Sequence, residues 1–467
     1  MKLAVALFLL ACATRAHADP DQAIAAIRRD ARIPVVAWIL IQPGRTDRVV
    51  ILGDDVSLDT PMRWGSITKT FAALTLMQVA EQAGVPLTTP VVNVLDTGLT
   101  GHTLPESMRL ENLITLSAGH TDLGREAFAD NTPHALRDAL QRYGDALRPV
   151  WPPALVHSYS NATPGLTEAV IETLTRQTFD KALKQSLAGP LHLASASVEP
   201  VSSLPGGYQA DGRTPIPYWH VTFRAFGALN LSPRDMGKFL RTVVDGGVWQ
   251  GQRVWSRQSQ HRLLTPQGYR AADSGLTTTY AAGTYGRIRQ GFPWHTHGGD
   301  ADGYRSRFAL LESHHAAYAI VINTDNPQAL AAMETVLEKH LTSGLERPAP
   351  PPAQRLAGGD ALSGWYYPAA TRFAHDRWRT CALPRVQVEA DEQELRIIRA
   401  GSTQRLLHIG GNRFRAEHDP QTTEIARRTP DGARFLFGEY GDLVKIRSKP
   451  GHAPPTLPAF MPGCLAE

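Results

Sequence analysis

Cysteine and lysine are both scarce in this chain of 467 residues, and each scarcity limits what the protein can be. Three cysteines exclude a framework of several disulfides. Only eight of the 48 basic residues are lysines, so a lysine inside a short motif is more informative than usual. Basic and acidic residues nearly cancel, at 48 against 44, which leaves no electrostatic case for binding nucleic acid.

Long apolar runs are absent after residue 18, so no membrane span is expected. The first 18 residues differ: Lys2 precedes an apolar run, Leu3–Ala13, and Ala16-His17-Ala18 has small residues at a cleavage spacing. This pattern is typical of a signal peptide, and it predicts a secreted or periplasmic protein. The alternative is a lipoprotein anchored through Cys12, because Leu9-Leu10-Ala11-Cys12 resembles a lipobox.

Two cysteines remain if cleavage follows Ala18, namely Cys381 and Cys464. In an oxidising compartment they can form one disulfide. It would close a loop of 83 residues, which the chain-entropy model values at about 4 kcal/mol. The alternative is two unrelated buried thiols.

A proline-rich segment, Glu346–Gln354 (ERPAPPPAQ), divides the chain and is typical of an extended linker. Residues 19–345 mix strand and helix patterns. Strands are expected at Val35–Gln42, Arg48–Gly53, Tyr304–Leu311 and Ala317–Asn323, and helices at Ser66–Gly84, Thr163–Leu174, Pro233–Val244 and Gln328–Leu341. With strands at both ends and helices between them, the region is predicted to be an α+β domain, an antiparallel sheet flanked by helices.

Residues 355–467 carry strand patterns alone. Short alternating segments are separated by turn residues, at Val386–Glu389, Glu394–Arg399, Arg405–Ile409, Arg413–Ala416, Thr423–Ala426, Arg434–Gly438 and Leu443–Ile446. This spacing predicts a small C-terminal all-β domain, a barrel or a sandwich.

The sharpest local motif is Ser66-Ile67-Thr68-Lys69, at the start of an expected helix. A serine there is most often only an N-cap. Lys69, however, lies one turn further on the same face, where an amine can take the serine proton. The helix N-terminus would stabilise a developing oxyanion.

Two further motifs add groups of matching chemistry. In Tyr159-Ser160-Asn161, a phenol near an ammonium can serve as general base, and the Asn161 amide can bind a substrate amide. In His297-Gly298-Gly299, the glycines allow close approach of a ligand, and His297 could orient a substrate carboxylate or the Tyr159 hydroxyl. Taken singly, each motif also fits an ordinary turn or hairpin.

Together the three motifs resemble those of the serine β-lactamase and D,D-peptidase superfamily, also called penicillin-binding-protein-like. The nearest branch is that of class C β-lactamases, D,D-carboxypeptidases, esterases and D-aminopeptidases. The resemblance implies that Ser66 is the acylated nucleophile, that Lys69 and Tyr159 move its proton and that Asn161 contacts the acyl group. It implies that His297, Gly298 and Gly299 border the substrate, and that the N–H groups of Ser66 and Asp300 form the oxyanion hole.

Two departures from the family pattern bear on the substrate. Gly298 stands where threonine is frequent, which removes a hydroxyl that could bind a carboxylate. Leu116 and Ala118 stand where histidine and serine are common in a T-H-T-S-G segment. The substrate is therefore left open among peptidoglycan-derived stem peptides, β-lactams, D-amino-acid peptides and short esters.

The expected activity is that of an exported serine hydrolase acting through an acyl-enzyme, with no cofactor and no metal. One alternative is a non-catalytic module that binds penicillin or peptidoglycan. A weaker alternative is a zinc metallohydrolase, because His295 and His297 with Asp300 and Asp302 superficially resemble a zinc signature.

Overall fold

The computed structural model describes residues 19–96, 98–369, 386–399, 401–429, 432–438 and 441–445. The expected signal peptide with Cys12 lies outside the described residues, as do Cys381 and Cys464. Among the helices that are described, none combines the length and the apolar character needed to cross a membrane.

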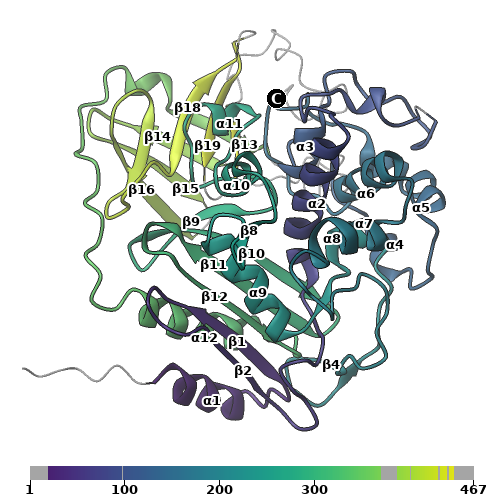
Figure 1. Cartoon of the computed structure of the whole chain (residues 1–467). Helices are drawn as coiled ribbons and strands as arrows, with labels where there is room; N and C mark the ends of the chain where they lie inside the picture. The colour runs from purple at the N-terminus through teal and green to yellow at the C-terminus, as the bar shows by residue number, and fades with distance from the viewer. Residues whose placement is uncertain are drawn as a thin grey trace, which may run out of the picture.

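A six-stranded antiparallel sheet, in the order β2-β1-β12-β11-β10-β9, forms the centre of the N-terminal region (Figure 1). Its strands are β1 (Val36–Ile41), β2 (Arg48–Leu52), β9 (Tyr285–Arg289), β10 (Phe292–Ala301), β11 (Tyr304–Leu311) and β12 (Ala316–Ile322). Because β1 pairs with β12, the two ends of this region meet inside the sheet, as expected. The edge strand β9 was not expected, because only one of its five residues is buried and its apolar alternation is weak.

Helices cover both faces of the sheet. On one face lie α1 (Pro20–Asp30) and α12 (Pro327–Leu341), which pack with Trp38 in one apolar cluster. On the other face lie α2 (Thr68–Gln82) and α9 (Pro233–Val244), which pack with Ile39 in a larger cluster. Because both faces are covered, all six residues of β1 are buried, and the strand is apolar throughout.

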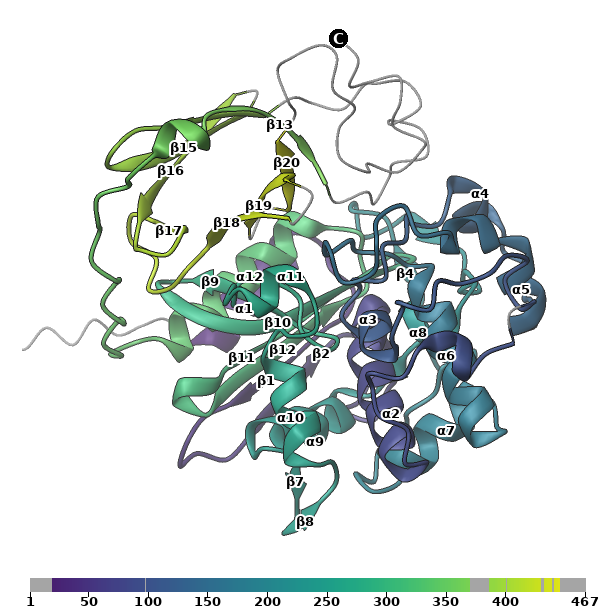
Figure 2. The same cartoon turned by 90° about the horizontal axis from the view of Figure 1, so that it is seen from above.

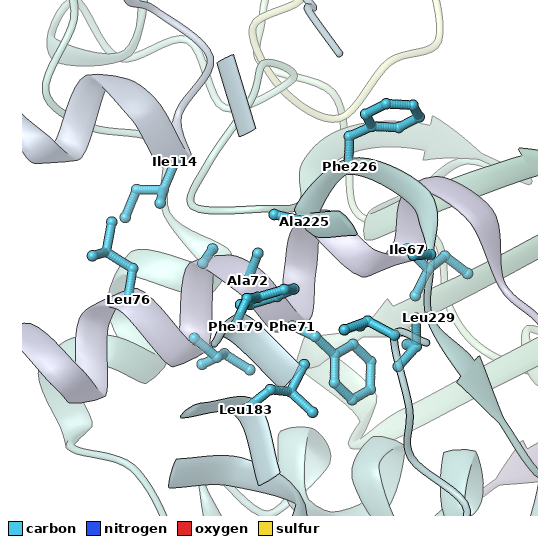
Figure 3. Close-up of a cluster of buried hydrophobic side chains, with 14 of the residues drawn as sticks. Ile67, Phe71, Ala72, Leu76, Ile114, Phe179, Leu183, Ala225, Phe226 and Leu229 are labelled. Atoms are coloured by element: carbon cyan, nitrogen blue, oxygen red, sulfur yellow. The ribbon is translucent and has the colours of Figure 1, made fainter. Parts of the chain in front are cut away.

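Helix α2 runs through the middle of the helical part of this region (Figure 2). Its residues from Thr68 to Ala80 are all buried, and Figure 3 shows part of the apolar cluster around Phe71. The other α-helices of this region are α3 (Leu110–Ile114), α4 (Arg125–Ala129), α5 (Leu136–Arg142), α6 (Thr163–Thr175), α7 (Phe179–Leu183), α8 (Arg224–Gly227), α10 (Arg257–Leu264) and α11 (Arg270–Asp273). Its short strands are β3 (Met62–Arg63), β4 (Gly207–Tyr208), β5 (Pro215–Ile216), β6 (Asn230–Leu231), β7 (Val248–Trp249) and β8 (Gln252–Arg253). Because α2 is buried along most of its length, it provides a rigid base for the residues at its N-terminus.

The C-terminal region is a closed barrel of eight strands, each paired with the next in chain order (Figure 2). These are β13 (Gly364–Pro368), β14 (Val386–Ala390), β15 (Glu394–Arg399), β16 (Ser402–His408), β17 (Arg413–Ala416), β18 (Glu424–Arg428), β19 (Arg434–Gly438) and β20 (Leu443–Lys445). The structure thus decides for a barrel over a sandwich. The seven strands expected from the sequence are confirmed, and β13 was missed because glycine and proline bound a run of only three aromatic residues.

The barrel packs on the N-terminal region through an apolar cluster that both regions contribute to. Trp151 lies in this cluster, and its indole nitrogen donates to the carbonyl oxygen of Ala369 at 2.6 Å. Residues 345–356, which include the expected linker, form no helix or strand. The contact brings the barrel next to the segment that precedes Tyr159.

Candidate active site

Ser66 lies in a short 3₁₀ turn, η1 (Gly65–Ile67), that leads directly into α2. Gly65 has a φ of +53°, and a Cβ atom there would lie 2.7 Å from the amide nitrogen of Asp300. Glycine is therefore required both by the backbone conformation and by the close approach of β10. The serine is set between a helix N-terminus and a strand edge.

Lys69 is buried one turn after Ser66, on the same face of the helix. Its Nζ donates to Ser66 Oγ at 3.1 Å, to Asn161 Oδ1 at 2.8 Å and to the carbonyl oxygen of Phe226 at 2.9 Å. These acceptors satisfy N–H bonds of the ammonium group, which compensates for burying its charge. The arrangement fixes a cation beside the serine hydroxyl.

Tyr159 joins this pair from a distant part of the chain. The centroid of its ring lies 4.8 Å from Lys69 Nζ and 6.3 Å from the centroid of the His297 ring. Tyr159, Ser66, Asn161 and His297 all line one cavity of about 1150 Å³. The hydroxyl and the amine of the first motif thus lie close to the phenol of the second.

Asn161 is held by a carboxylate that the sequence analysis did not single out. Asp122 accepts from the backbone nitrogen of Asn161 at 2.6 Å and from its Nδ2 at 3.2 Å. These contacts turn Oδ1 of Asn161 toward Lys69. The segment compared above with T-H-T-S-G ends at Gly119, and Asp122 follows three residues later. Its position just after that segment was the only feature of the sequence that could have pointed to Asp122.

His297 is buried, and neighbouring groups engage both ring nitrogens. Nδ1 lies 2.6 Å from the carbonyl oxygen of Gly298 and must donate, so Nε2 accepts from the hydroxyl of Tyr280 at 2.8 Å. Burial, aided by the positive charge of Lys69, lowers the pKa of His297 to about 3. At neutral pH the ring is uncharged, which does not favour a role in binding a substrate carboxylate as a cation.

The glycines after His297 allow two close approaches. A side chain on Gly299 would collide with the carbonyl oxygen of Trp64, and one on Gly298 would overlap the guanidinium of Arg307. β9 pairs with β10 only as far as Thr296. Beyond Thr296 the edge of β10 is therefore not covered by β9. It faces the Ser66 turn, and the N–H of Asp300 lies next to that turn.

A buried acid, Glu168, holds the backbone next to an acceptor of Lys69. Glu168 on α6 accepts from the backbone nitrogen of Ala225 at 3.1 Å, and Ala225 precedes Phe226, whose carbonyl accepts from Lys69. Burial raises the pKa of Glu168 to about 8, so this side chain is mostly protonated at neutral pH. It supplies a hydrogen bond without adding a full negative charge beneath the site.

The barrel also reaches the cavity. Asp442, between β19 and β20, lines it and accepts from the backbone nitrogen of His157 at 3.1 Å. Burial raises the pKa of Asp442 to about 7. Because His157 is two residues before Tyr159, the barrel contacts the segment that carries the phenol.

The histidines and aspartates of the zinc metallohydrolase alternative have other partners in the structure. His295 pairs with Glu312 at 3.3 Å, His297 contacts Tyr280, and Asp302 pairs with Arg63 at 2.5 Å. In the part of the chain that the structure describes, no group of three or more histidine, cysteine, aspartate or glutamate side chains is placed to hold a metal ion.

Comparison with known proteins agrees with this geometry. The family model described as Beta-lactamase matches residues 20–342. A penicillin-binding protein 4 from Amycolatopsis lactamdurans is 24% identical over 340 residues, which cover 66% of this chain and 85% of that protein. Two solved structures share the fold: an octameric penicillin-binding protein homologue from Pyrococcus abyssi (TM-score 0.57, 18% identity, 91% of this chain and 99% of that one), and a D-amino acid amidase from Ochrobactrum anthropi SV3 (TM-score 0.56, 21% identity, 70% and 99%).

Proposed function

The chain belongs to the beta-lactamase family, and from that premise we propose that it is a serine hydrolase that cleaves an amide, peptide or ester bond through an acyl-enzyme on Ser66. The observation that carries the proposal is the 3.1 Å contact between Lys69 Nζ and Ser66 Oγ, at a serine that lines the same cavity as Tyr159. A nucleophile and the group that activates it require this range of distance.

In the proposed reaction, Ser66 Oγ attacks the substrate carbonyl carbon while its proton passes to the Lys69–Tyr159 pair. The ammonium of Lys69 favours the phenolate form of Tyr159, which can take that proton. The carbonyl electrons move to the oxygen, which the N–H groups of Ser66 and Asp300 stabilise. The bond to the leaving group then breaks, and Tyr159 returns the proton to that group.

The second half of the reaction restores the enzyme. A water molecule attacks the acyl carbon and gives a proton to the same pair. The bond to Ser66 Oγ breaks, the acid product leaves, and the serine regains its proton. Asp122 serves this cycle by keeping Oδ1 of Asn161 against Lys69.

The test is a measurement of intact mass after exposure to a fluorophosphonate, nitrocefin, D-Ala-D-Ala peptides and p-nitrophenyl esters. We expect a stable adduct of one phosphonate on Ser66, and turnover of at least one ester, amide or β-lactam. Ser66→Ala is expected to lose both, whereas the control Ser203→Ala, at an exposed serine outside the cavity, keeps both. Unchanged turnover in Ser66→Ala would refute the proposal.

The same measurement decides between catalysis and binding alone. A Ser66 adduct that forms with penicillin, without turnover of any ester or amide, would favour a non-catalytic penicillin- or peptidoglycan-binding module over an enzyme. Adduct formation followed by release favours the hydrolase.

We also propose that the protein is exported, because Lys2, the apolar run Leu3–Ala13 and Ala16-His17-Ala18 form a signal pattern. Sequencing the N-terminus of the mature protein should find Asp19. A lipid-modified N-terminal Cys12 would instead identify a lipoprotein. In an oxidising compartment Cys381 and Cys464 should form a disulfide, seen as a mass increase of about 2 Da on reduction.

A further inference from the structure

The barrel packs on two loops that both lead into the cavity around Ser66. Val156 in one loop and Leu276 in the other belong to the apolar cluster that the two regions share. Tyr159 follows Val156 by three residues, and Tyr280 follows Leu276 by four. Both tyrosines line the cavity. The barrel therefore covers the chain immediately before two side chains of the site.

Asp442 is a polar side chain of the barrel that reaches this cavity. Among the described barrel residues, it lines the cavity together with two glycines, Gly438 and Gly441. Asp442 is 3% exposed, and its Oδ2 accepts from the backbone nitrogen of His157 at 3.1 Å. Its own carbonyl oxygen accepts from the backbone nitrogen of Ala369 at 2.7 Å, next to β13. The carboxyl group is thus anchored in the barrel and holds a residue of the N-terminal region.

The chain from His157 to Asn161 is held at several backbone N–H groups. The N–H of Ser158 donates to a backbone carbonyl oxygen 3.0 Å away, and that of Asn161 donates to Asp122 at 2.6 Å. The N–H of His157 depends on the barrel for its acceptor. Because Tyr159 lies between these anchors, loss of the first anchor would let its backbone shift.

The ring of His157 extends the influence of this contact to the second tyrosine. It stacks on the ring of Tyr280, with centroids 5.0 Å apart and an interplanar angle of 19°. Tyr280 lies edge-on to Tyr159, with ring centroids 6.4 Å apart, and its hydroxyl donates to His297 Nε2 at 2.8 Å. Burial lowers the pKa of His157 to about 4, so the stacked ring is uncharged at neutral pH. A displaced His157 would therefore disturb the surroundings of Tyr159 from two directions.

Asp442 serves this contact as a hydrogen-bond acceptor, whichever protonation form it takes. Burial raises the pKa of its carboxyl group to about 7, so the protonated and the ionised forms are both present at neutral pH. Each form keeps an oxygen that can accept from the N–H of His157. An asparagine has such an oxygen too, whereas an alanine has none.

We propose that Asp442 is a positioning residue for Tyr159. It holds His157, and through His157 it places the phenol that returns the proton to the leaving group. The proposal rests on the proposed function. Proton transfer requires the phenol within hydrogen-bond reach of the leaving group, and a displacement of about 1 Å can lower the rate by about 100-fold. The barrel is then part of the catalytic unit, because one of its side chains sets the position of the proton donor.

The test compares two esters with the same acyl group, p-nitrophenyl butyrate and ethyl butyrate. The p-nitrophenolate group leaves as a stable anion, whereas the ethoxide group needs a proton as it leaves. The values of kcat/KM report acylation, and their ratio isolates the delivery of that proton. Release of p-nitrophenol and of ethanol measures the two reactions. A ratio taken on one preparation is independent of any misfolded fraction.

The variants are Asp442→Ala and Asp442→Asn. We expect Asp442→Ala to raise the ratio of the p-nitrophenyl ester to the ethyl ester by about tenfold or more. Asp442→Asn should stay within about threefold of the wild type, because the amide oxygen replaces the acceptor. The matched control is Arg427→Met, which removes another contact of the barrel with the N-terminal region, to Ser274 at 3.0 Å, outside the cavity. The control should leave the ratio unchanged.

A double variant shows whether Asp442 acts through the phenol. In the Tyr159→Phe background, Asp442→Ala should lower kcat/KM for p-nitrophenyl butyrate by less than about twofold. A larger loss in that background would mean that Asp442 acts independently of Tyr159. The fluorophosphonate counts the reactive serines in each preparation.

Failure of the inference differs from failure of the proposed function. If the fluorophosphonate does not modify Ser66 and neither ester is hydrolysed, the proposed function is refuted. If Ser66 reacts but the ratio is the same in Asp442→Ala and the wild type, Asp442 does not position the proton donor. Equal losses in Asp442→Asn and Asp442→Ala would overturn its role as an acceptor. Hydrolysis of the p-nitrophenyl ester alone by the wild type would show that no proton donor is in place, which also overturns the inference.

Discussion

The ammonium of Lys69 and the side-chain carbonyl of Asn161 lie 2.8 Å apart, although 92 residues separate them in the chain. Lys69 comes from the buried helix α2, and Asn161 from the loop before α6. This contact joins two short motifs into one site. It also gives the buried cation a strong acceptor in addition to Ser66, so that the amine keeps one position relative to the nucleophile.

We expect Lys69→Met and Tyr159→Phe each to lower kcat by on the order of 10³ or more, because both groups move the same proton. Their double variant should lose little more than either single one. Steady-state kinetics on the best substrate would measure this. Lys238→Met, which removes a lysine outside the cavity, is the control. Single variants that stay within tenfold of the wild type would contradict the proton relay.

Gly299→Ala is expected to lower kcat by about 10² or more, because the new methyl group would collide with the carbonyl oxygen of Trp64. The collision moves β10 away from the Ser66 turn and weakens the contribution of the Asp300 N–H to the oxyanion hole. Gly98→Ala is a suitable control, since the nearest atom to its added Cβ lies 3.7 Å away. Kinetics and melting temperature should be recorded together. Full activity in Gly299→Ala would mean that this strand edge does not stabilise the oxyanion.

Asp122→Asn is expected to lower kcat by roughly tenfold to 100-fold, because an amide would place a donor against the donors of Asn161 and leave one unsatisfied. Asp122 acts through Asn161, so a double-mutant cycle with Asn161→Ala should be strongly non-additive. Additive effects of the two substitutions would show that Asp122 acts independently.

Glu168→Gln is expected to stabilise the protein increasingly as the pH rises from about 5 to about 8. Burial raises the pKa of Glu168 in the folded state to about 8 from its ordinary 4.5, so between these values the folded state holds a proton that the unfolded chain releases. The free energy of unfolding of the wild type therefore falls as the pH rises through this window, by about 1.4 kcal/mol per pH unit at most. The variant lacks this loss.

Urea denaturation of wild type and Glu168→Gln at pH values from 5 to 9 would measure the difference. It should grow up to about pH 8 and then level off. A difference that is constant with pH would mean that Glu168 titrates normally.

The sequence by itself determined the mixed α+β region and the all-β region. It also predicted the hydroxyl of Ser66, the amine of Lys69 and the phenol of Tyr159 as groups of one site. The reason is local: apolar periodicity follows from which faces are buried, and it located α9 and β11 at their observed bounds. Ser66 and Lys69 share a face because three residues nearly complete one helical turn, so their contact follows from spacing alone.

Only the tertiary structure decided which distant groups complete the site. Asp122, Tyr280 and Phe226 carry no motif, and they act through positions that the packing of separate loops creates. The charge of His297 was likewise undetermined, because its pKa depends on burial and on the nearby ammonium of Lys69. Long-range packing and the surrounding dielectric set these properties, and neither can be read from neighbouring residues in the chain.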